Sequence, residues 1–321
     1  MRWWTLESGI SSPVAQASVG ALVIGVALAC AVLGARIAPY DPVRYDPRGT
    51  LAGPSAAHLL GTDPLGRDVL SQIIAGARIS MVVGMLSVAA GMLVGTAVGL
   101  VAGSAPGRAA EVLMRGMDAL LVFPSLVLAL AITAFLGVNL WNVVGALAVT
   151  FVPTFAMLVR GEVLSLRERE FVTAAGALGV GRLRIMWRHL LPNLRDVLLV
   201  QASFGVGTAI LTEASLSFLG LGVPPPALSW GRILREGYSY LLLAPWISVA
   251  SGAAIFLIVL AFQMLSDGFQ DVLAHRGRSA RRGVVIRRPA RLRALRRLVP
   301  GQQLGCTREC DRTDTHGPGP A

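Results

Sequence analysis

The sequence predicts an all-α, polytopic membrane protein, because it is strongly apolar and its charges are separated by long uncharged stretches. Of its 321 residues, 54% are hydrophobic and only 15% are charged, unlike the composition of a soluble globular domain. Residues 8–35, 79–107, 119–159 and 237–266 contain no charged side chain. Because one crossing of a bilayer needs about 20 apolar helical residues, these stretches are long enough to be membrane spans.

Six spans are expected, from the uncharged stretches and from the apolar run that follows Asp196. They are predicted at 17–38, 80–103, 119–137, 142–160, 197–220 and 246–266. The chain then divides into a short amino-terminal segment, 1–16, a membrane domain, 17–275, and a tail, 276–321. The tail is rich in arginine and has no extended apolar run, so it is predicted to be disordered.

The distribution of arginine predicts which loops lie in the cytoplasm. Segment 160–196 contains seven arginines and the chain after Asp267 contains twelve, whereas segment 39–77 has three arginines and four aspartates. Positively charged loops are retained on the cytoplasmic side of a membrane. Both termini and the loops 104–118 and 161–196 are therefore predicted to be cytoplasmic.

All 29 basic residues are arginines, and the complete absence of lysine excludes several functions. A Walker A phosphate loop needs a lysine that reaches the nucleotide phosphates, and a Schiff-base enzyme needs a reactive lysine. If ATP drives this protein, another chain must bind it, and no cofactor is expected on this one. The cysteines Cys30, Cys306 and Cys310 indicate neither a disulfide framework nor a metal site.

The second predicted span contains four glycines at every fourth position, Gly91, Gly95, Gly99 and Gly103. Residues four apart share one face of a helix, so these glycines form a stripe without side chains. In lipid, such stripes let two helix backbones approach closely. The spacing favours a helix-packing face over glycines that are merely tolerated in a span.

The loop between the fourth and fifth spans contains an amphipathic pattern of its own, within REREFVTAAGALGVGRLRIMWRHLLPN at 167–193. Phe171, Ala174, Ala175 and Leu178 share one helical face. A face with small side chains can dock in a shallow groove of a soluble partner, and Gly179 would let the chain turn afterwards. The pattern equally allows an amphipathic helix that lies on the membrane surface.

This loop resembles the EAA loop of binding-protein-dependent ABC importer permeases, in Thr173-Ala174-Ala175, Gly179 and Leu191-Pro192. The resemblance implies a type I ABC importer permease fold, in which the loop forms a coupling helix that docks on an ATPase subunit. Threonine stands where the family motif begins with glutamate, and His189 stands where many members have isoleucine. The coupling residues implied by the resemblance are Glu170, Phe171, Thr173, Ala174, Ala175, Gly179, Leu191 and Pro192.

Three further stretches are similar to the C-type subunit of dipeptide, oligopeptide and nickel permeases. They are HLLGTDPLGRDVLS at 58–71, DALLVFP at 118–124 and TEASLSFLGLG at 212–222. The resemblance implies import of di- or oligopeptides across a bacterial inner membrane, with nickel or another small solute as the alternative. It also implies four partners: a B-type permease, two ATP-binding subunits that hold ATP and Mg, and an extracytoplasmic solute-binding protein.

Glu213 is the one carboxylate inside a predicted span. A buried charge in a membrane is costly and usually functional, so Glu213 either lines the transport pathway or has a structural hydrogen-bonding role. An ion-coupled secondary transporter would need more such acids near the bilayer midplane. A membrane enzyme is disfavoured because the histidines are in separate segments outside the spans, and no catalytic residue is expected. These histidines are His58, His189, His275 and His316.

Overall fold

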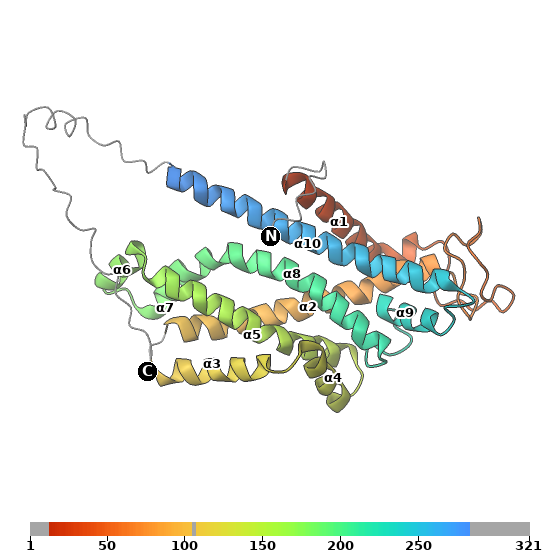
Figure 1. The fold of residues 1–321 in the computed structure, drawn as a ribbon, viewed down its shortest axis with the longest axis horizontal. Helices are drawn as coiled ribbons and strands as arrows, with labels where there is room; N and C mark the ends of the chain where they lie inside the picture. The colour runs from red at the N-terminus through yellow and green to blue at the C-terminus, as the bar shows by residue number, and fades with distance from the viewer. Residues whose placement is uncertain (1–12, 105–106, 283–321) are drawn as a thin grey trace, which may run out of the picture. The chain divides into compact units, whose positions relative to one another are not determined.

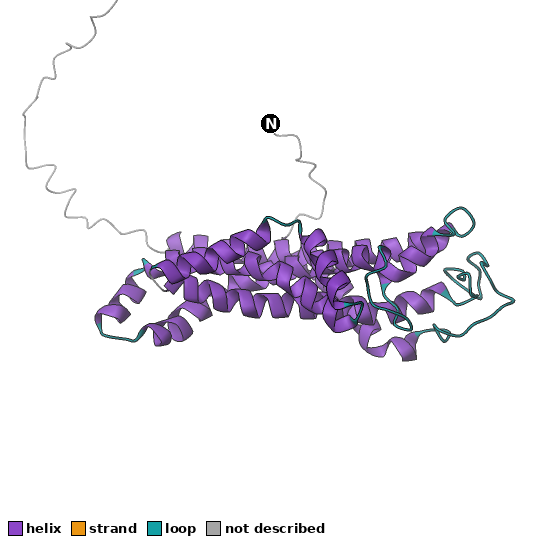
Figure 2. Ribbon diagram, turned by 90° about the horizontal axis from the view of Figure 1, so that it is seen from below, coloured by secondary structure: helices purple, strands orange, loops and turns teal. Residues whose placement is uncertain are grey.

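Residues 13–104 and 107–282 are described by a computed structural model, and they form helices joined by turns and irregular segments (Figures 1 and 2). No strand occurs within these residues, although Thr62 and Asp68 form an isolated bridge. The chain separates into two units between Arg276 and Gly277, and the contacts described below belong to the first. The helices are α1 Pro13–Ile37, α2 Val69–Ser104, α3 Arg108–Leu121, α4 Ser125–Leu136, α5 Leu140–Arg167, α6 Glu170–Ala177, α7 Arg182–Ile185, α8 Leu191–Phe218, α9 Trp230–Tyr238 and α10 Pro245–Arg282.

The predicted all-α membrane fold is confirmed. Five segments are helical, long and apolar enough to cross a bilayer, and the α3–α4 pair makes six if it is counted as one span. Several helices continue beyond the predicted spans and beyond the uncharged stretches. For example, α2 begins at Val69 rather than at 80, and α10 continues to Arg282 rather than ending at 266. Residues 276–282 of the tail predicted to be disordered are the helical end of α10, which corrects that expectation. The rest of the tail, with the cysteines at 306 and 310, lies outside the described residues.

The third predicted span, 119–137, is not one continuous helix, which corrects the expectation. The structure has α3 and α4 bent by 90° across a short break. Pro124 lies in that break as the residue before α4. A proline disfavours helical backbone in the residue that precedes it and has no N–H for the helix ladder. By contrast, Pro153 is accommodated within the single helix α5.

The close contact between α2 and α5 organises the centre of the bundle. Gly91, Gly95, Gly99 and Gly103 all face α5, where a Cβ atom at each would come within 2.6 to 2.7 Å of an α5 side-chain atom. At Gly95, a Cβ atom would lie 2.6 Å from both the Cβ of Phe155 and the carbonyl oxygen of Val152. The stripe therefore packs within this subunit, so it is not free to face a partner or lipid.

The connecting segments gather at two ends of the helical bundle. Figure 1 shows α6 and α7 at one end, and α9 with the irregular segment 38–68 at the other. Figure 2 shows the same separation, with the helices between two groups of loops. The arginine-rich loop and the aspartate-containing segment are thus on opposite sides of the spans, as the charge distribution requires for a membrane protein.

Candidate functional site

Helix α6 is held against the bundle by one side only. It begins at Glu170, whose carboxylate lies in the first turn, where the helix dipole favours a negative charge. Val172 and Ala175 are its buried residues, and Val172 belongs to an apolar cluster that includes Leu166 of α5 and Leu194 of α8. This contact joins α6 to the spans α5 and α8.

The other side of α6 is exposed and consists of small residues after Phe171. Thr173, Ala174 and Ala177 are exposed on it. Ala177 is four residues after Thr173 and three after Ala174, so the three share one face of the helix. The predicted face was therefore partly wrong. Ala174 is exposed as expected, but Ala175 is only 8% exposed and faces the rest of this chain. A four-residue apolar pattern did not distinguish the anchoring side from the free side.

Gly179 ends α6 in a tight turn. Its φ is 78°, in the left-handed region that favours glycine. The amide of Val180 donates to the carbonyl of Ala175 at 3.1 Å, and the amide of Gly179 donates to that of Gly176 at 3.0 Å. This pair of bonds is the Schellman motif, which satisfies carbonyls left free at a helix end. A Cβ atom at Gly179 would meet nothing within 4 Å, so its backbone conformation, not crowding, favours glycine.

The chain after this turn forms a concave, basic surface. A cavity of about 790 Å³ is lined by Gly179–Arg184 and Trp187. The side chains of Leu183 and Trp187 are 66% and 65% exposed. A π-helical turn over Met186–Leu190 then leads into α8, with Pro192 in the first turn. Exposed apolar side chains beside arginines are typical of a protein-binding surface.

The opposite end of the bundle is fastened by a buried charge network. Arg67 is 8% exposed, and its guanidinium donates to Asp63 and to Glu236 of α9, the latter at 2.9 Å. Gln72 of α2 also donates to Asp63, at 2.7 Å. The motif at 58–71 thus links the irregular segment to α2 and α9. Sequence reasoning missed this role, because Glu236 lies far from the motif in the chain.

Glu213 is completely buried, which favours the structural alternative over a lining residue of an open pathway. The hydroxyl of Ser217 donates to its carboxylate at 2.7 Å, and that of Ser80 on α2 donates at 3.4 Å. Ser80 also accepts from the backbone N–H of Trp230, at 3.2 Å. The carboxylate therefore helps to place the start of α9 between α2 and α8. Buried polar groups need such partners. Because Ser80 is 133 residues from Glu213 in the sequence, no sequence pattern indicated this network.

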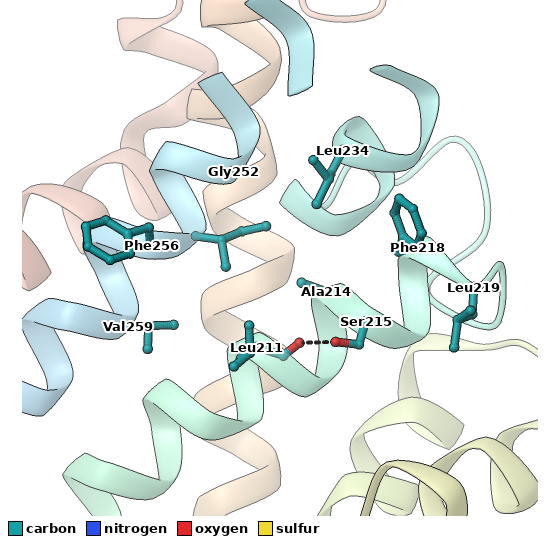
Figure 3. Close-up of a pocket in the computed structure, with 10 residues that line it drawn as sticks. Leu211, Ala214, Ser215, Phe218, Leu219, Leu234, Gly252, Phe256 and Val259 are labelled. Atoms are coloured by element: carbon teal, nitrogen blue, oxygen red, sulfur yellow. Dashed lines mark hydrogen bonds between the residues drawn. The ribbon is translucent and has the colours of Figure 1, made fainter. Parts of the chain in front are cut away.

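An apolar hollow lies between α8 and α10, with α9 beside it (Figure 3). It has a volume of about 620 Å³. Phe218, Leu234 and Phe256 are among its lining side chains, and the Ser215 hydroxyl donates to the carbonyl of Leu211 at 2.9 Å. Since that hydroxyl is satisfied within its own helix, this hollow presents mainly hydrocarbon.

Comparison with known proteins identifies the chain. A model of the family described as "Binding-protein-dependent transport system inner membrane component" matches residues 95–279. The chain belongs to this family. The matched region of this permease runs from Gly95 in the glycine stripe into α10, and it includes α6, Gly179 and Glu213.

Three relatives of the permease are 42% identical to it over most of their length. A glutathione transport system permease protein of Pectobacterium atrosepticum matches over 253 residues, which are 78% of this chain and 84% of the relative. A dipeptide transport system permease protein of Alkalihalophilus pseudofirmus matches over 258 residues, 80% and 84% of the two chains. A di/tripeptide transport system permease protein of Pseudomonas aeruginosa matches over 260 residues, 79% and 86%.

Proposed function

We propose that this permease is one of two channel-forming subunits of an ATP-driven importer of small peptides. The named relatives of the permease handle glutathione, dipeptides or di- and tripeptides, which supports a peptide substrate. The other components would be a B-type permease, two ATP-binding subunits and an extracytoplasmic solute-binding protein. In this proposal the ATP-binding subunits hold ATP and Mg²⁺, and the permease contributes conformational coupling without a catalytic residue.

The observation that carries the proposal is the two-sided geometry of α6. Its inner side is anchored to α5 and α8, and its outer side exposes small residues beside the basic cavity after Gly179. An ATPase that closes on the outer side of α6 would move the two spans together. Such a docking element biases the permease between inward- and outward-open states, provided that its contacts differ between those states.

The proposal requires reconstitution of all the components to give ATP-dependent uptake. The complete complex in proteoliposomes, with a solute-binding protein, should accumulate a labelled dipeptide only when ATP is supplied on the α6 side. Omission of the ATP-binding subunits should abolish uptake, because this chain has no lysine for a phosphate loop. Uptake by this permease driven by an ion gradient alone would overturn the proposal.

We infer the orientation of the permease from its arginine distribution, and cysteine labelling tests this inference. In a background with Cys30, Cys306 and Cys310 replaced by serine, new cysteines at Ser55 and Leu242 should react with an impermeant reagent added outside. Leu242 is 98% exposed, and both positions precede a span at the end opposite to α6. A cysteine at Ala177, which is exposed on α6, should react only after the membrane is opened. Labelling of Ala177 in intact cells would reverse the orientation.

A further inference from the structure

A second, polar hollow lies at the end of α8, on the side of the bundle away from α6. It has a volume of about 460 Å³, within the range of roughly 300–1,000 Å³ that small-molecule sites occupy. Its walls come from the end of α8, the turn at 220–225 and the polar side of α9. The polar lining residues include Ser217, Arg232, Arg235, Glu236 and Ser239.

The ionised side chains that line this hollow are two guanidiniums and one carboxylate, so the lining carries a positive surplus. The carboxylate of Glu236 is already occupied: it accepts from Arg232 at 2.9 Å and from Arg67 at 2.9 Å. Arg67 in turn is neutralised by Asp63. Within the described residues, Arg235 has no ion pair or side-chain hydrogen bond. Its charge is therefore available to a ligand.

The turn beneath Arg235 is shaped to admit this guanidinium. Gly220 has a φ of 89°, and a Cβ atom at this position would overlap the guanidinium of Arg235. A side chain at Gly222 would likewise overlap Ser217. Glycine at 220 thus serves two needs, since it permits the left-handed turn and leaves room for the arginine to lie across the backbone.

We propose that this hollow binds the carboxylate of a small peptide at the outer mouth of the permease, with Arg235 as the binding residue. A guanidinium recognises a carboxylate through two parallel N–H···O bonds, which are stronger than bonds between neutral groups. Arg232 strengthens the positive field but remains paired with Glu236. This inference rests on the proposed function for its substrate class, while the hollow and its charge stand on the geometry alone.

The test is a binding measurement on the assembled importer in nanodiscs, without the solute-binding protein. The probes are dialanine and its C-terminal amide, and their dissociation constants are measured by saturation-transfer NMR. The unmodified importer should bind dialanine about tenfold more tightly than the amide, a difference of about 1.4 kcal/mol. Arg235→Gln should remove this preference by weakening dialanine binding about tenfold, and Arg235→Lys should retain part of it.

Arg44→Gln is the matched control, because Arg44 is an exposed arginine in the irregular segment at the same end of the bundle. It should leave both dissociation constants unchanged. If Arg235→Gln preserves the preference for dialanine over its amide, the proposal is wrong. If it preserves the preference but weakens capture of the purified solute-binding protein, the hollow is instead a docking point for that protein and the proposal is also wrong.

The outcomes separate this inference from the proposed function. Normal ATP-driven dipeptide uptake, together with an unchanged preference in Arg235→Gln, would overturn the carboxylate site and leave the importer assignment standing. Conversely, a preference that Arg235→Gln removes, in an importer that transports no peptide, would support the carboxylate site and overturn the peptide assignment.

Discussion

Ala174→Trp is expected to weaken ATPase coupling strongly while leaving the membrane domain folded. Ala174 lies on the exposed side of α6, so a large side chain there meets no part of its own subunit's core. In a close-packed docking contact, an added side chain costs about 1–3 kcal/mol, which weakens association roughly 5- to 150-fold by the relation between free energy and affinity. The measurement is ATP turnover by the reconstituted complex, with and without loaded solute-binding protein.

Ala174→Ser is the matched control, since it keeps a small side chain at the same position and should retain stimulated hydrolysis. Ala175→Trp would be a poor test, because Ala175 is buried within the subunit and its replacement would disturb α6 itself. If Ala174→Trp leaves both stimulation and uptake intact, α6 is not the docking element and the proposed mechanism fails.

The turn at Gly179 offers a second variant pair for the same mechanism. Gly179→Val should oppose the left-handed backbone, whereas Gly179→Asn should be tolerated, because asparagine visits this region far more readily than a β-branched residue. A Cβ atom at Gly179 would meet nothing in this chain. Loss of coupling in Gly179→Val but not in Gly179→Asn would therefore show that coupling needs the left-handed turn. Loss in both variants would implicate close approach of the partner.

Gly95→Leu is expected to prevent stable folding of the permease. Because a Cβ at Gly95 would lie 2.6 Å from the carbonyl oxygen of Val152, the backbones of α2 and α5 would have to separate. The cost should exceed the roughly 1–3 kcal/mol of ordinary overpacking, since backbone cannot move aside as a side chain can. We expect loss of the monodisperse peak in detergent size-exclusion chromatography, and Gly95→Ala should already lower the melting temperature.

Gly145→Leu provides the control for that prediction. Gly145 is exposed on α5, the helix that the stripe contacts, and a Cβ there would meet nothing within 4 Å. The isolated subunit with this change should melt like the unmodified protein. A stable, monodisperse Gly95→Leu subunit would show that the two helices do not need their close approach.

The position of Glu213 shows why sequence reasoning about the site was incomplete. Its charge and its place in a span were visible in the sequence, but they did not distinguish a pathway-lining role from a structural one. The answer depends on Ser80 and on the start of α9, which are distant in the chain and have no distinctive pattern. The same is true of Arg67 and Glu236, whose pairing joins segments separated by 169 residues.

By itself, the sequence determined the features that depend on local chemistry. Long uncharged stretches are stable only as helices in lipid, where every backbone group must be paired internally. Four-residue glycine spacing places small residues on one helix face whatever the helix contacts. Likewise, the glycine after an amphipathic run indicated the turn that ends α6, where Gly179 has a φ of 78°.

Only the tertiary structure decided which partner each of these features meets. The glycine stripe faces α5, and Ala175 faces the bundle while Ala174 faces outward. Periodicity defines faces of a helix but not what covers them, because burial depends on packing between segments far apart in the chain. The 90° bend at Pro124 is likewise a feature of the tertiary structure. A proline permits either a kinked or a continuous span, and the surrounding helices select one of them.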